Sequence, residues 1–487
     1  MKKLLFFLLI PILSFGQVQI GDDIDGEAAN DFSGGSVSLS SDGTILAIGA
    51  SGNDDSGSNS GHVRVYENQE NTWVQIGQDI NGEAQGDNSG ASVSLSSDGT
   101  ILATGANLND GNGMDSGHVR VYENQENTWV QIGQDINGET AFDFSGDSIS
   151  LSSDGATVAI GAFLNSGNGI RSGHVRIYEN QGGNWVQIGE DIDGEAENDE
   201  SGASVSLSSD GSIVAIGAHR NDANGSNSGH VRVYENQGGN WVQIGEDIDG
   251  EAGGDLSGTV SLSSDGAIVA IGAEENDDNG AGSGHVRIYE NQGGNWNQIG
   301  QDIEGEAVFD GLGISVSLSS NGNVVAMGAT GNGANGSNSG HVRIYENQGG
   351  NWVQIGEDID GEAEFDNSGR SVSLSSDGSL VAIGAAGNND NGTDSGHVRV
   401  FDLSGLLSTQ ESSLTTFSIY PNPAKETITL TLSEVNTLQK VTIYNSLGQE
   451  VVRSTQSSID VSSLSKGVYV IEVQTTTGKA SEKLIIQ

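Results

Sequence analysis

The chain has 487 residues, among them 74 Gly, 3 Pro and no Cys, and its formal net charge is −49 at pH 7. The absence of Cys excludes a disulfide framework, thiol catalysis and Cys-ligated zinc. Between residues 17 and 412 every basic residue is Arg, and acidic residues far outnumber them. Such a surface repels nucleic acids and anionic lipids, because both are bound through Lys and Arg. We therefore expect no nucleic-acid partner.

Residues 1–16, "MKKLLFFLLIPILSFG", have the pattern of a secretory signal peptide. Two Lys precede an apolar run from Leu4 to Leu13, and small residues at Ser14 and Gly16 precede the expected cleavage site. The run is too short to span a membrane, and no later segment approaches the roughly 20 apolar residues that a spanning helix needs. We expect an exported, soluble mature chain that starts at Gln17 and does not insert into membranes.

The segment 17–404 contains one pattern seven times. The motif "SGHVR" recurs with its His at His62, His118, His174, His230, His285, His341 and His397. Each copy predicts four short strands, which in the fourth copy are "SVSLS" (204–208), "IVAIGA" (213–218), "HVRVY" (230–234) and "WVQIG" (241–245). Alternation of apolar and polar residues predicts that one face of each strand is buried. The "SDG" between the first two strands suits a two-residue hairpin.

Tandem four-stranded units of this length are typical of a β-propeller. We therefore predict an all-β fold, a seven-bladed propeller of 56-residue repeats over 17–404. A Trp opens the fourth strand in only six copies, at Trp73, Trp129, Trp185, Trp241, Trp296 and Trp352. The mature chain, in turn, begins with a fourth strand that nothing precedes. Residues 18–21 are therefore predicted to pair with 397–401 and to close the ring, since an open ring would expose unpaired strand edges.

The segments "D-x-S-G-x-S-V-S-L", "V-A-I-G-A" and "S-G-H-V-R-V-Y" resemble the FG-GAP repeat of integrin α-chain propellers and related bacterial secreted proteins. The resemblance covers all seven copies and implies binding or adhesion. The Phe of "FG" is replaced by Ser in six copies, Ser33 in the first, and by Leu312 in the sixth. Where the family has a calcium loop, this chain has only "SSDG" or "SSNG", which is too short to wrap an ion. WD repeats, which share "S-x-D-G" before "V-A-x-G", are the alternative family and also imply a propeller.

Residues 417–487 are different in kind. The motifs "YPNP", "YNSLGQEV", "LSKGVYVIEV" and "KLIIQ" resemble, in the family's order, the type A C-terminal sorting domain of the type IX secretion system of Bacteroidota. The resemblance implies that this secretion machinery is a partner, and that the protein is released or attached at the cell surface. The segment itself predicts about seven strands in a small β-sandwich. Residues 405–416 form the expected linker.

The acidic loop before each first strand is the candidate metal site. In "DIDGEAEND" the carboxylates stand at relative positions one, three, five and nine, and odd-position oxygen ligands around a Gly are how calcium loops are built. Calcium is therefore the candidate cofactor. The alternative is a solvated Asp/Gly-rich connection. The candidate ligands are Asp23, Asp25, Glu27 and Asp31; Asp191, Asp193, Glu195 and Asp199; Asp247, Asp249, Glu251 and Asp255; and Asp358, Asp360, Glu362 and Asp366.

The repeated His and Trp residues each allow two interpretations. Seven imidazoles could bind metal or carry acid–base chemistry, but hydrogen bonding between blades is favoured, because an Arg two residues away would repel a metal ion. The Trp residues could stack on carbohydrate, but packing between blade edges is favoured, since large aromatic side chains mostly serve burial. His219 does not repeat and is expected in a loop.

Nothing in the chain resembles a nucleophile elbow, a P-loop, a zinc-binding His pair or a dinucleotide fingerprint. A glycosidase needs one acid and one base in different environments, whereas the carboxylates here recur in equivalent copies. No blade shows a unique cluster of acid, His or Tyr. We expect a non-enzymatic secreted or cell-surface propeller for adhesion or ligand binding, whose partner is an extracellular protein or glycan. The alternatives are a structural matrix or surface-layer protein and, less favoured, an extracellular polysaccharide-acting enzyme.

Overall fold

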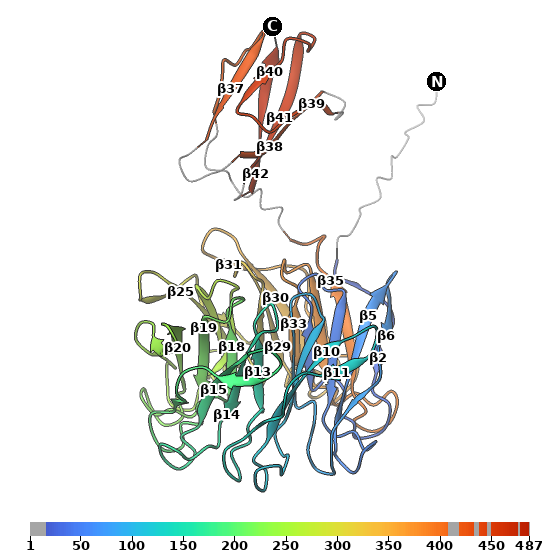
Figure 1. The fold of residues 1–487 in the computed structure, drawn as a ribbon, viewed down its shortest axis with the longest axis vertical. Coiled ribbons are helices and arrows are strands. Elements are labelled where there is room, and N and C mark those ends of the chain that lie inside the picture. The colour runs from blue at the N-terminus through green and yellow to red at the C-terminus, as the bar shows by residue number, and fades with distance from the viewer. Residues whose placement is uncertain (1–15, 408–417, 433–437, 446–449, 476–477, 487) are drawn as a thin grey trace, which may run out of the picture. The chain divides into compact units, whose positions relative to one another are not determined.

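The computed structural model describes residues 16–407, 418–432, 438–445, 450–475 and 478–486. These form two compact units, separated between residues 406 and 407 (Figure 1). The described residues contain β-strands and no α-helix, and hence no helix of the length and hydrophobicity that a membrane span requires. The predicted signal peptide, apart from Gly16, and most of the predicted linker lie outside the described residues.

The first unit consists of seven β-sheets, numbered here as blades 1 to 7 in chain order of their first strands. Blade 1 contains β3 (Ser36–Leu39), β4 (Ile45–Ala50), β5 (His62–Gln69), β6 (Thr72–Gln75) and β7 (Ile80–Asn81). Blades 2 to 4 follow as β8 (Ser92–Leu95), β9 (Ile101–Ala106), β10 (His118–Asn124), β11 (Trp129–Gln131) and β12 (Ile136–Asn137); β13 (Ser148–Leu151), β14 (Thr157–Ala162), β15 (His174–Asn180), β16 (Trp185–Gln187) and β17 (Ile192–Asp193); and β18 (Ser204–Leu207), β19 (Ile213–Ala218), β20 (His230–Asn236), β21 (Trp241–Gln243) and β22 (Ile248–Asp249).

The remaining three blades complete the ring and confirm the predicted seven-bladed propeller. Blades 5 and 6 are β23 (Thr259–Leu262), β24 (Ile268–Ala273), β25 (His285–Asn291), β26 (Trp296–Gln298) and β27 (Ile303–Glu304); and β28 (Ser315–Leu318), β29 (Val324–Ala329), β30 (His341–Asn347), β31 (Trp352–Gln354) and β32 (Ile359–Asp360). Blade 7 is β33 (Ser368–Leu374), β34 (Leu380–Ala385), β35 (His397–Asp402) and two strands from the other end of the unit, β1 (Val18–Gln19) and β2 (Ile24–Asp25).

The fourth strand of each blade is interrupted, which the sequence did not predict. In blade 1, β6 and β7 both pair with β5, with Tyr66 opposite Gln75 and His62 opposite Asn81. Gly77 lies between them at φ 76°, a backbone conformation that favours Gly. Asp79 lies in the segment between β6 and β7, and its Oδ1 accepts a hydrogen bond of 2.6 Å from Gln75 Nε2.

The N-terminal strand closes the ring, as predicted. Val18 pairs with Asp402 and Gln19 with Phe401, and Ile24 pairs with Val398 further along the same strand. No Trp follows blade 7. The space beside Gly356 that corresponds to the Trp positions is taken by the side chains of Gln17 and Leu406. The two ends of the propeller segment therefore fill the place of a seventh Trp.

The Ser residues of the first strands hold the blades together around the axis. The backbone N–H of Leu95 donates to Ser38 Oγ of blade 1 at 3.0 Å, and the N–H of Leu39 donates to Ser373 Oγ of blade 7 at 3.0 Å. An equivalent hydrogen bond joins each of the remaining pairs of neighbouring blades. A partly buried hydroxyl thus accepts a hydrogen bond from the next blade, which explains why Ser alternates with Val and Leu in these strands.

The apolar cores lie between blades. One cluster combines Val63 and Val65 of blade 1 with Leu95, Leu102 and Trp129 of blade 2. Trp129, Trp185 and Trp352 are only 3% exposed. The indole Nε1 of every Trp donates to a backbone carbonyl of the preceding blade at 2.8–3.1 Å. Packing between blade edges, the favoured interpretation of the Trp set, is confirmed.

The described residues of the second unit form a two-sheet sandwich with seven strands. One sheet has the order β36 (Ser418–Tyr420), β37 (Thr427–Thr431), β40 (Ser458–Asp460). The other has the order β39 (Glu450–Ser454), β38 (Leu438–Tyr444), β41 (Gly467–Thr475), β42 (Gly478–Ile486). Ile428, Val441, Ile443, Ile471 and Leu484 are fully buried in its core. The predicted sandwich is confirmed.

Candidate functional site

Two sets of loops share one face of the propeller. His62 pairs with both Ala50 and Asn81, so the long loop 51–61 and the part of the acidic loop that follows β7, residues 82–91, leave blade 1 at the same end of its strands. The acidic loop of one blade bonds to the long loop of the blade before it, as when Phe142 N donates to Met114 O at 2.8 Å. We call the face formed by these fourteen loops the loop face; it is the lower face of the propeller in Figure 1.

The residues at positions nine and three of the acidic loops have structural roles, through the carboxylate at position nine and the backbone at position three. Asp31 is buried, and its Oδ2 accepts hydrogen bonds from the N–H groups of Ala28 at 2.9 Å and Glu27 at 3.2 Å. Asp199, Asp255 and Asp366 cap their own loops in the same way. At position three, Asp25, Asp193, Asp249 and Asp360 belong to the short strands β2, β17, β22 and β32. Their backbone carbonyls, rather than their carboxylates, accept a hydrogen bond from the Arg of the following blade.

The carboxylates at positions one and five of a single loop belong to two different groups. Asp23 lies with Glu362, Asp390 and His397, whereas Glu27 lies with Asp55, His62 and Asp79. Asp191 and Glu195 divide in the same way between His174 and His230, and Asp247 and Glu251 between His230 and His285. Asp358 faces His341, and Glu362 faces His397. The structure therefore gathers carboxylates from successive loops around each His.

The repeated His residues do not hydrogen-bond between blades, so the favoured interpretation of them was wrong. All seven are at most 1% exposed, and in six of them Nδ1 has no hydrogen-bond partner among the described residues. A buried polar atom without a partner costs about 1–3 kcal/mol. Burial, reinforced by the neighbouring Arg120 and Arg287, lowers the pKa of His118 and His285 to about 4. These imidazoles are therefore neutral at pH 7.

The repeats differ most at the opening of the central channel on the loop face. The first strands contact one another around the axis, so the residues just before them, and those just after the second strands, surround this opening. Just before the "S-V-S-L" segment of the first strand ("S-I-S-L" in blade 3), six of the seven blades have Gly35, Ala91, Asp147, Ala203, Ile314 and Arg370, the last of which lies within β33. After the second strand stand Ser51, Asn107, Phe163, His219, Glu274, Thr330 and Ala386. We call these two sets the channel mouth.

The channel mouth contains a group of charged residues that does not repeat and whose members come from different blades, whereas the expectation from the sequence concerned such clusters only within single blades. Asn107 Nδ2 donates to Asp147 Oδ1 at 2.6 Å. Burial raises the pKa values of Asp147 and Glu274, and the charges of both Arg370 and His219 oppose this rise at each carboxyl. His219 lies in a turn, as expected, and its Nε2 is 3.1 Å from Glu200 Oε2. Sequence reasoning missed the group because its members come from different blades.

A cavity of about 330 Å³ lies on the loop face. Its lining comes from blades 6 and 7 and from the acidic loop of blade 1, namely Phe32, Thr330, Asn367, Arg370, Ala386, Gly387 and Asp394. Because Arg370 belongs both to this lining and to the channel mouth, the cavity and the unique charged residues form one continuous candidate site.

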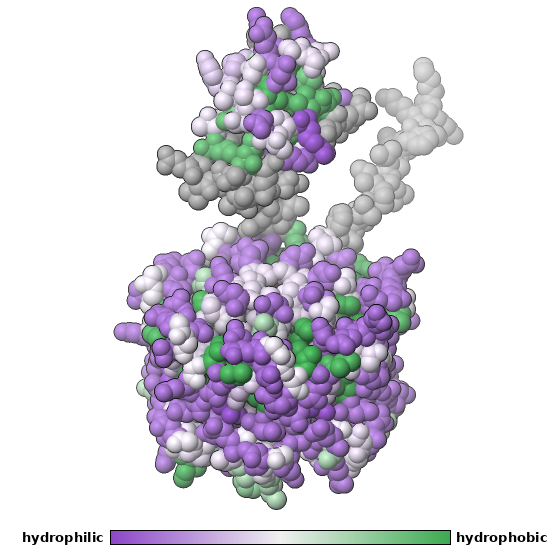
Figure 2. Space-filling model, in the orientation of Figure 1, coloured by the Kyte–Doolittle hydropathy of each residue, from purple (hydrophilic) through white to green (hydrophobic). Residues whose placement is uncertain are grey.

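Three Phe residues on the loop face are both exposed and conformationally unfavourable. Phe142, Phe309 and Phe365 are 52%, 70% and 52% exposed, with φ values of 69°, 65° and 68°. At the equivalent position other blades have Asn30, Gly86, Asn198 and Gly254, which tolerate this left-handed conformation. For Phe it costs about 1–2 kcal/mol. Figure 2 shows hydrophobic groups at the lower end of the propeller, in addition to those on its side. These Phe side chains are not buried, and their backbone conformation does not favour Phe, so neither packing nor backbone preference explains why Phe stands at these positions. A role in contacting a ligand is therefore favoured.

The comparisons with known proteins identify the two kinds of domain. Residues 24–66, 192–234 and 359–401 match the FG-GAP repeat, and residues 418–487 match the secretion system C-terminal sorting domain. The chain thus contains three FG-GAP repeats within its β-propeller, and a type IX C-terminal sorting domain, which indicates export to the cell surface or secretion. No curated protein matches the sequence.

The comparison with solved structures found the following two matches among others. Hydrazine synthase of Kuenenia stuttgartiensis is 14% identical, with a TM-score of 0.51, over 79% of this chain and 97% of that chain. A protein of Bacteroides uniformis assigned as a 6-phosphogluconolactonase is 13% identical, with a TM-score of 0.48, over 67% of this chain and 85% of that chain. At these identities the likeness to hydrazine synthase concerns the fold alone.

Proposed function

We propose that the protein is a non-enzymatic propeller that binds an extracellular protein or glycan at its channel mouth after export by the type IX system. The proposal rests mainly on one observation. The seven repeats share the residues that build the blades, but they differ in the residues that surround the mouth of the channel. Arg370, Glu274 and His219 there come from three blades and present both signs of charge. The neighbouring cavity and the exposed Phe365 add apolar contact area.

A purely structural matrix protein has no need for this asymmetry. Its contacts would use surfaces that repeat from blade to blade, and the channel mouth does not repeat. Self-association of the full chain, measured by analytical ultracentrifugation, distinguishes the two functions, since a ligand-binding propeller does not need to assemble with itself.

Binding is tested by screening the full chain against glycan and matrix-protein arrays. We expect Arg370→Gln and Glu274→Gln to weaken any specific binding at least tenfold, because each removes a charge from the mouth. Glu126→Gln is the matched control, since Glu126 is an exposed residue of the loop after β10, at the opposite end of blade 2. Binding that survives both mouth substitutions would contradict the proposed location.

The carboxylates of the mouth also favour a second candidate, a polysaccharide-acting enzyme. Burial raises the pKa values of Asp147 and Glu274, and a carboxyl with a raised pKa is what a glycosidase uses as its general acid. Release of reducing ends from polysaccharides by the full chain, abolished by Asp147→Asn or Glu274→Gln, would establish this activity and overturn the non-enzymatic proposal.

A further inference from the structure

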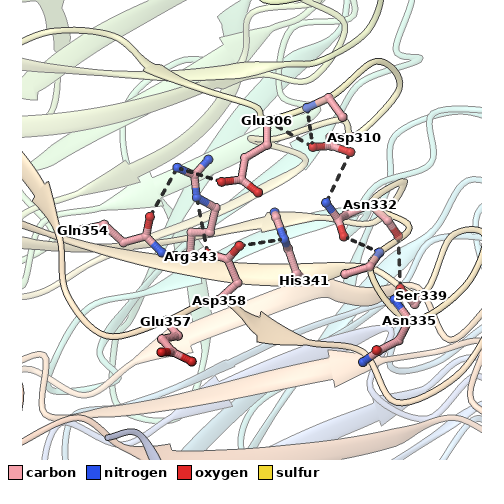
Figure 3. A network of polar contacts seen from close by, with 12 residues as sticks. Glu306, Asp310, Asn332, Asn335, Ser339, His341, Arg343, Gln354, Glu357 and Asp358 are labelled. Atoms are coloured by element: carbon pink, nitrogen blue, oxygen red, sulfur yellow. Dashed lines mark hydrogen bonds and ion pairs between the residues drawn. The ribbon is translucent and has the colours of Figure 1, made fainter.

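Each blade contains one His–carboxylate group, which we define as the repeated His together with position five of the preceding acidic loop and position one of the next. In blade 3 these residues are Glu139, His174 and Asp191. Figure 3 shows the equivalent Glu306, His341 and Asp358 of blade 6. The other groups are Glu27, His62 and Asp79; Glu83, His118 and Asp135; Glu195, His230 and Asp247; Glu251, His285 and Asp302; and Glu362, His397 and Asp23.

The distances within a group do not fit hydrogen bonds but fit ligands of a common ion. His174 Nδ1 is 3.6 Å from Asp191 Oδ2 and 4.0 Å from Glu139 Oε2. A hydrogen bond between such atoms would span about 2.7–3.2 Å. Two ligands that bind one ion at about 2.0–2.2 Å lie roughly 3.3–4.2 Å apart, depending on the angle between them. The same spacing recurs at His230, His285, His341 and His397.

Other side chains orient the two carboxylates toward the imidazole. Gln187 Nε2 donates to Asp191 Oδ1 at 2.6 Å, so that Oδ2 is the oxygen that faces His174. Arg176 Nη1 lies 3.7 Å from Glu139 Oε1, so that Oε2 faces His174. Arg176, which could repel a metal ion, instead lies beside Glu139 Oε1, the oxygen that faces away from His174, and offsets the charge of that carboxylate. Such outer partners are typical of metal sites, where they fix the orientation of the ligands.

We infer that the His–carboxylate groups are seven equivalent sites for a divalent transition-metal ion, foremost Zn²⁺, ligated by Nδ1 of the His and by one oxygen each of the Glu and the Asp. One imidazole nitrogen with two carboxylates suits Zn²⁺, whereas Ca²⁺ prefers a shell made only of oxygen. The buried Nδ1 atoms without a hydrogen-bond partner point into these groups. This inference is independent of the ligand proposed at the channel mouth.

Such an ion would connect parts of the fold that are distant in sequence. In blade 3 it would join β15, the interrupted fourth strand and the connection from blade 2, because His174, Asp191 and Glu139 come from these three segments. In blade 7 it would join the N-terminal segment to β35, since Asp23 Oδ2 lies 3.9 Å from His397 Nδ1. Metal binding would therefore hold the ring closed at the place where the chain itself is not continuous.

Metal content measures the number of sites. The full chain is stripped with a chelator, dialysed against micromolar Zn²⁺ in 150 mM sodium chloride and analysed by mass spectrometry of the metal, with about seven ions per chain expected. Glu195→Gln should remove one ion and Glu139→Gln with Glu195→Gln two; both residues are exposed enough to change without unfolding the protein. The control Glu126→Gln should remove none. A zinc content that neither variant lowers overturns the inference.

A spectroscopic measurement identifies the ligand without any variant. Cu²⁺ in place of Zn²⁺ should give an electron paramagnetic resonance spectrum with hyperfine coupling to one imidazole nitrogen per ion. A spectrum of carboxylate-bound copper alone, or loss of the zinc on addition of millimolar Ca²⁺, would mean that the acidic surface merely attracts cations, and would overturn the inference.

Discussion

Gln19 and Phe401 are paired across the two ends of the propeller, in the antiparallel ladder between β1 and β35. Ile20 N–H continues this pairing by donating to Val400 O at 2.8 Å. The seventh blade thus depends on a segment synthesised before the first blade, and every sheet edge that an open ring would expose is covered.

Deleting residues 17–24 should destabilise the propeller by roughly 3–5 kcal/mol, because about four backbone hydrogen bonds worth about 1 kcal/mol each are lost and an edge is exposed. Differential scanning calorimetry should show a lower melting temperature or aggregation. Inserting the same segment directly after residue 404 should restore stability, since β35 regains its partner. A deletion variant that melts like the parent would contradict closure by this strand.

Removing residues 418–487 should leave the propeller folded but held in the periplasm of a host with the type IX system. The reason is that these residues match the sorting domain and belong to a unit with its own core. Cell fractionation and circular dichroism of the truncated protein check both parts. Surface delivery of the truncated chain would argue against the assigned role of the segment.

Phe309→Asn should stabilise the propeller by about 1 kcal/mol, because Asn tolerates the left-handed conformation that Phe309 adopts at φ 65°. The reverse change at the equivalent position, Asn198→Phe, should destabilise it by a similar amount. Chemical denaturation measures both. If ligand binding falls with Phe309→Asn while stability rises, the strain at this Phe serves binding; a destabilised Phe309→Asn would mean that the side chain is needed for packing.

Glu304 should make stability depend on pH. Burial, with a contribution from Asp302, raises its pKa to about 7. The folded state therefore binds a proton more tightly than the unfolded state, where the pKa is about 4.3. Stability should decrease as pH rises from about 4 to 7 and then stay level. Glu304→Gln should accordingly raise the melting temperature at pH 8 but hardly at pH 4, whereas the exposed control Glu126→Gln should have no such effect at either pH.

Calcium and zinc should differ in their effect on thermal stability. A site made only of loop carboxylates, as the sequence predicts, would give stabilisation by millimolar calcium. The His–carboxylate groups predict a larger stabilisation by micromolar zinc, because the imidazole nitrogen favours that ion. Melting curves of the full chain with each ion, with chelator and with sodium chloride of equal ionic strength separate these outcomes. Equal stabilisation by sodium chloride would show that the ions only screen the repulsion between the loop carboxylates and bind at no specific site.

The repeat pattern predicted the blades because a strand's alternation of apolar and polar residues is a local property, and because six Trp residues against seven "SGHVR" motifs revealed the closing strand. The break at Gly77 was not predicted. A Gly permits a bend without requiring one, and only the pairing of both β6 and β7 with β5 shows where the chain returns to the sheet.

The sequence by itself determined the all-β architecture, the number of blades, the ring closure and the sorting domain, since period, strand alternation and local motifs are written along the chain. Only the tertiary structure decided what the polar residues do. Glu139, His174 and Asp191 meet because a closed ring sets each acidic loop against its neighbours. Burial raises the pKa of Asp147, and the charges of Arg370 and His219 oppose this rise although the three residues belong to different blades, because the first strands of all blades surround one axis. Distances across a ring depend on curvature and on the packing of every blade, and neither is encoded at any single position.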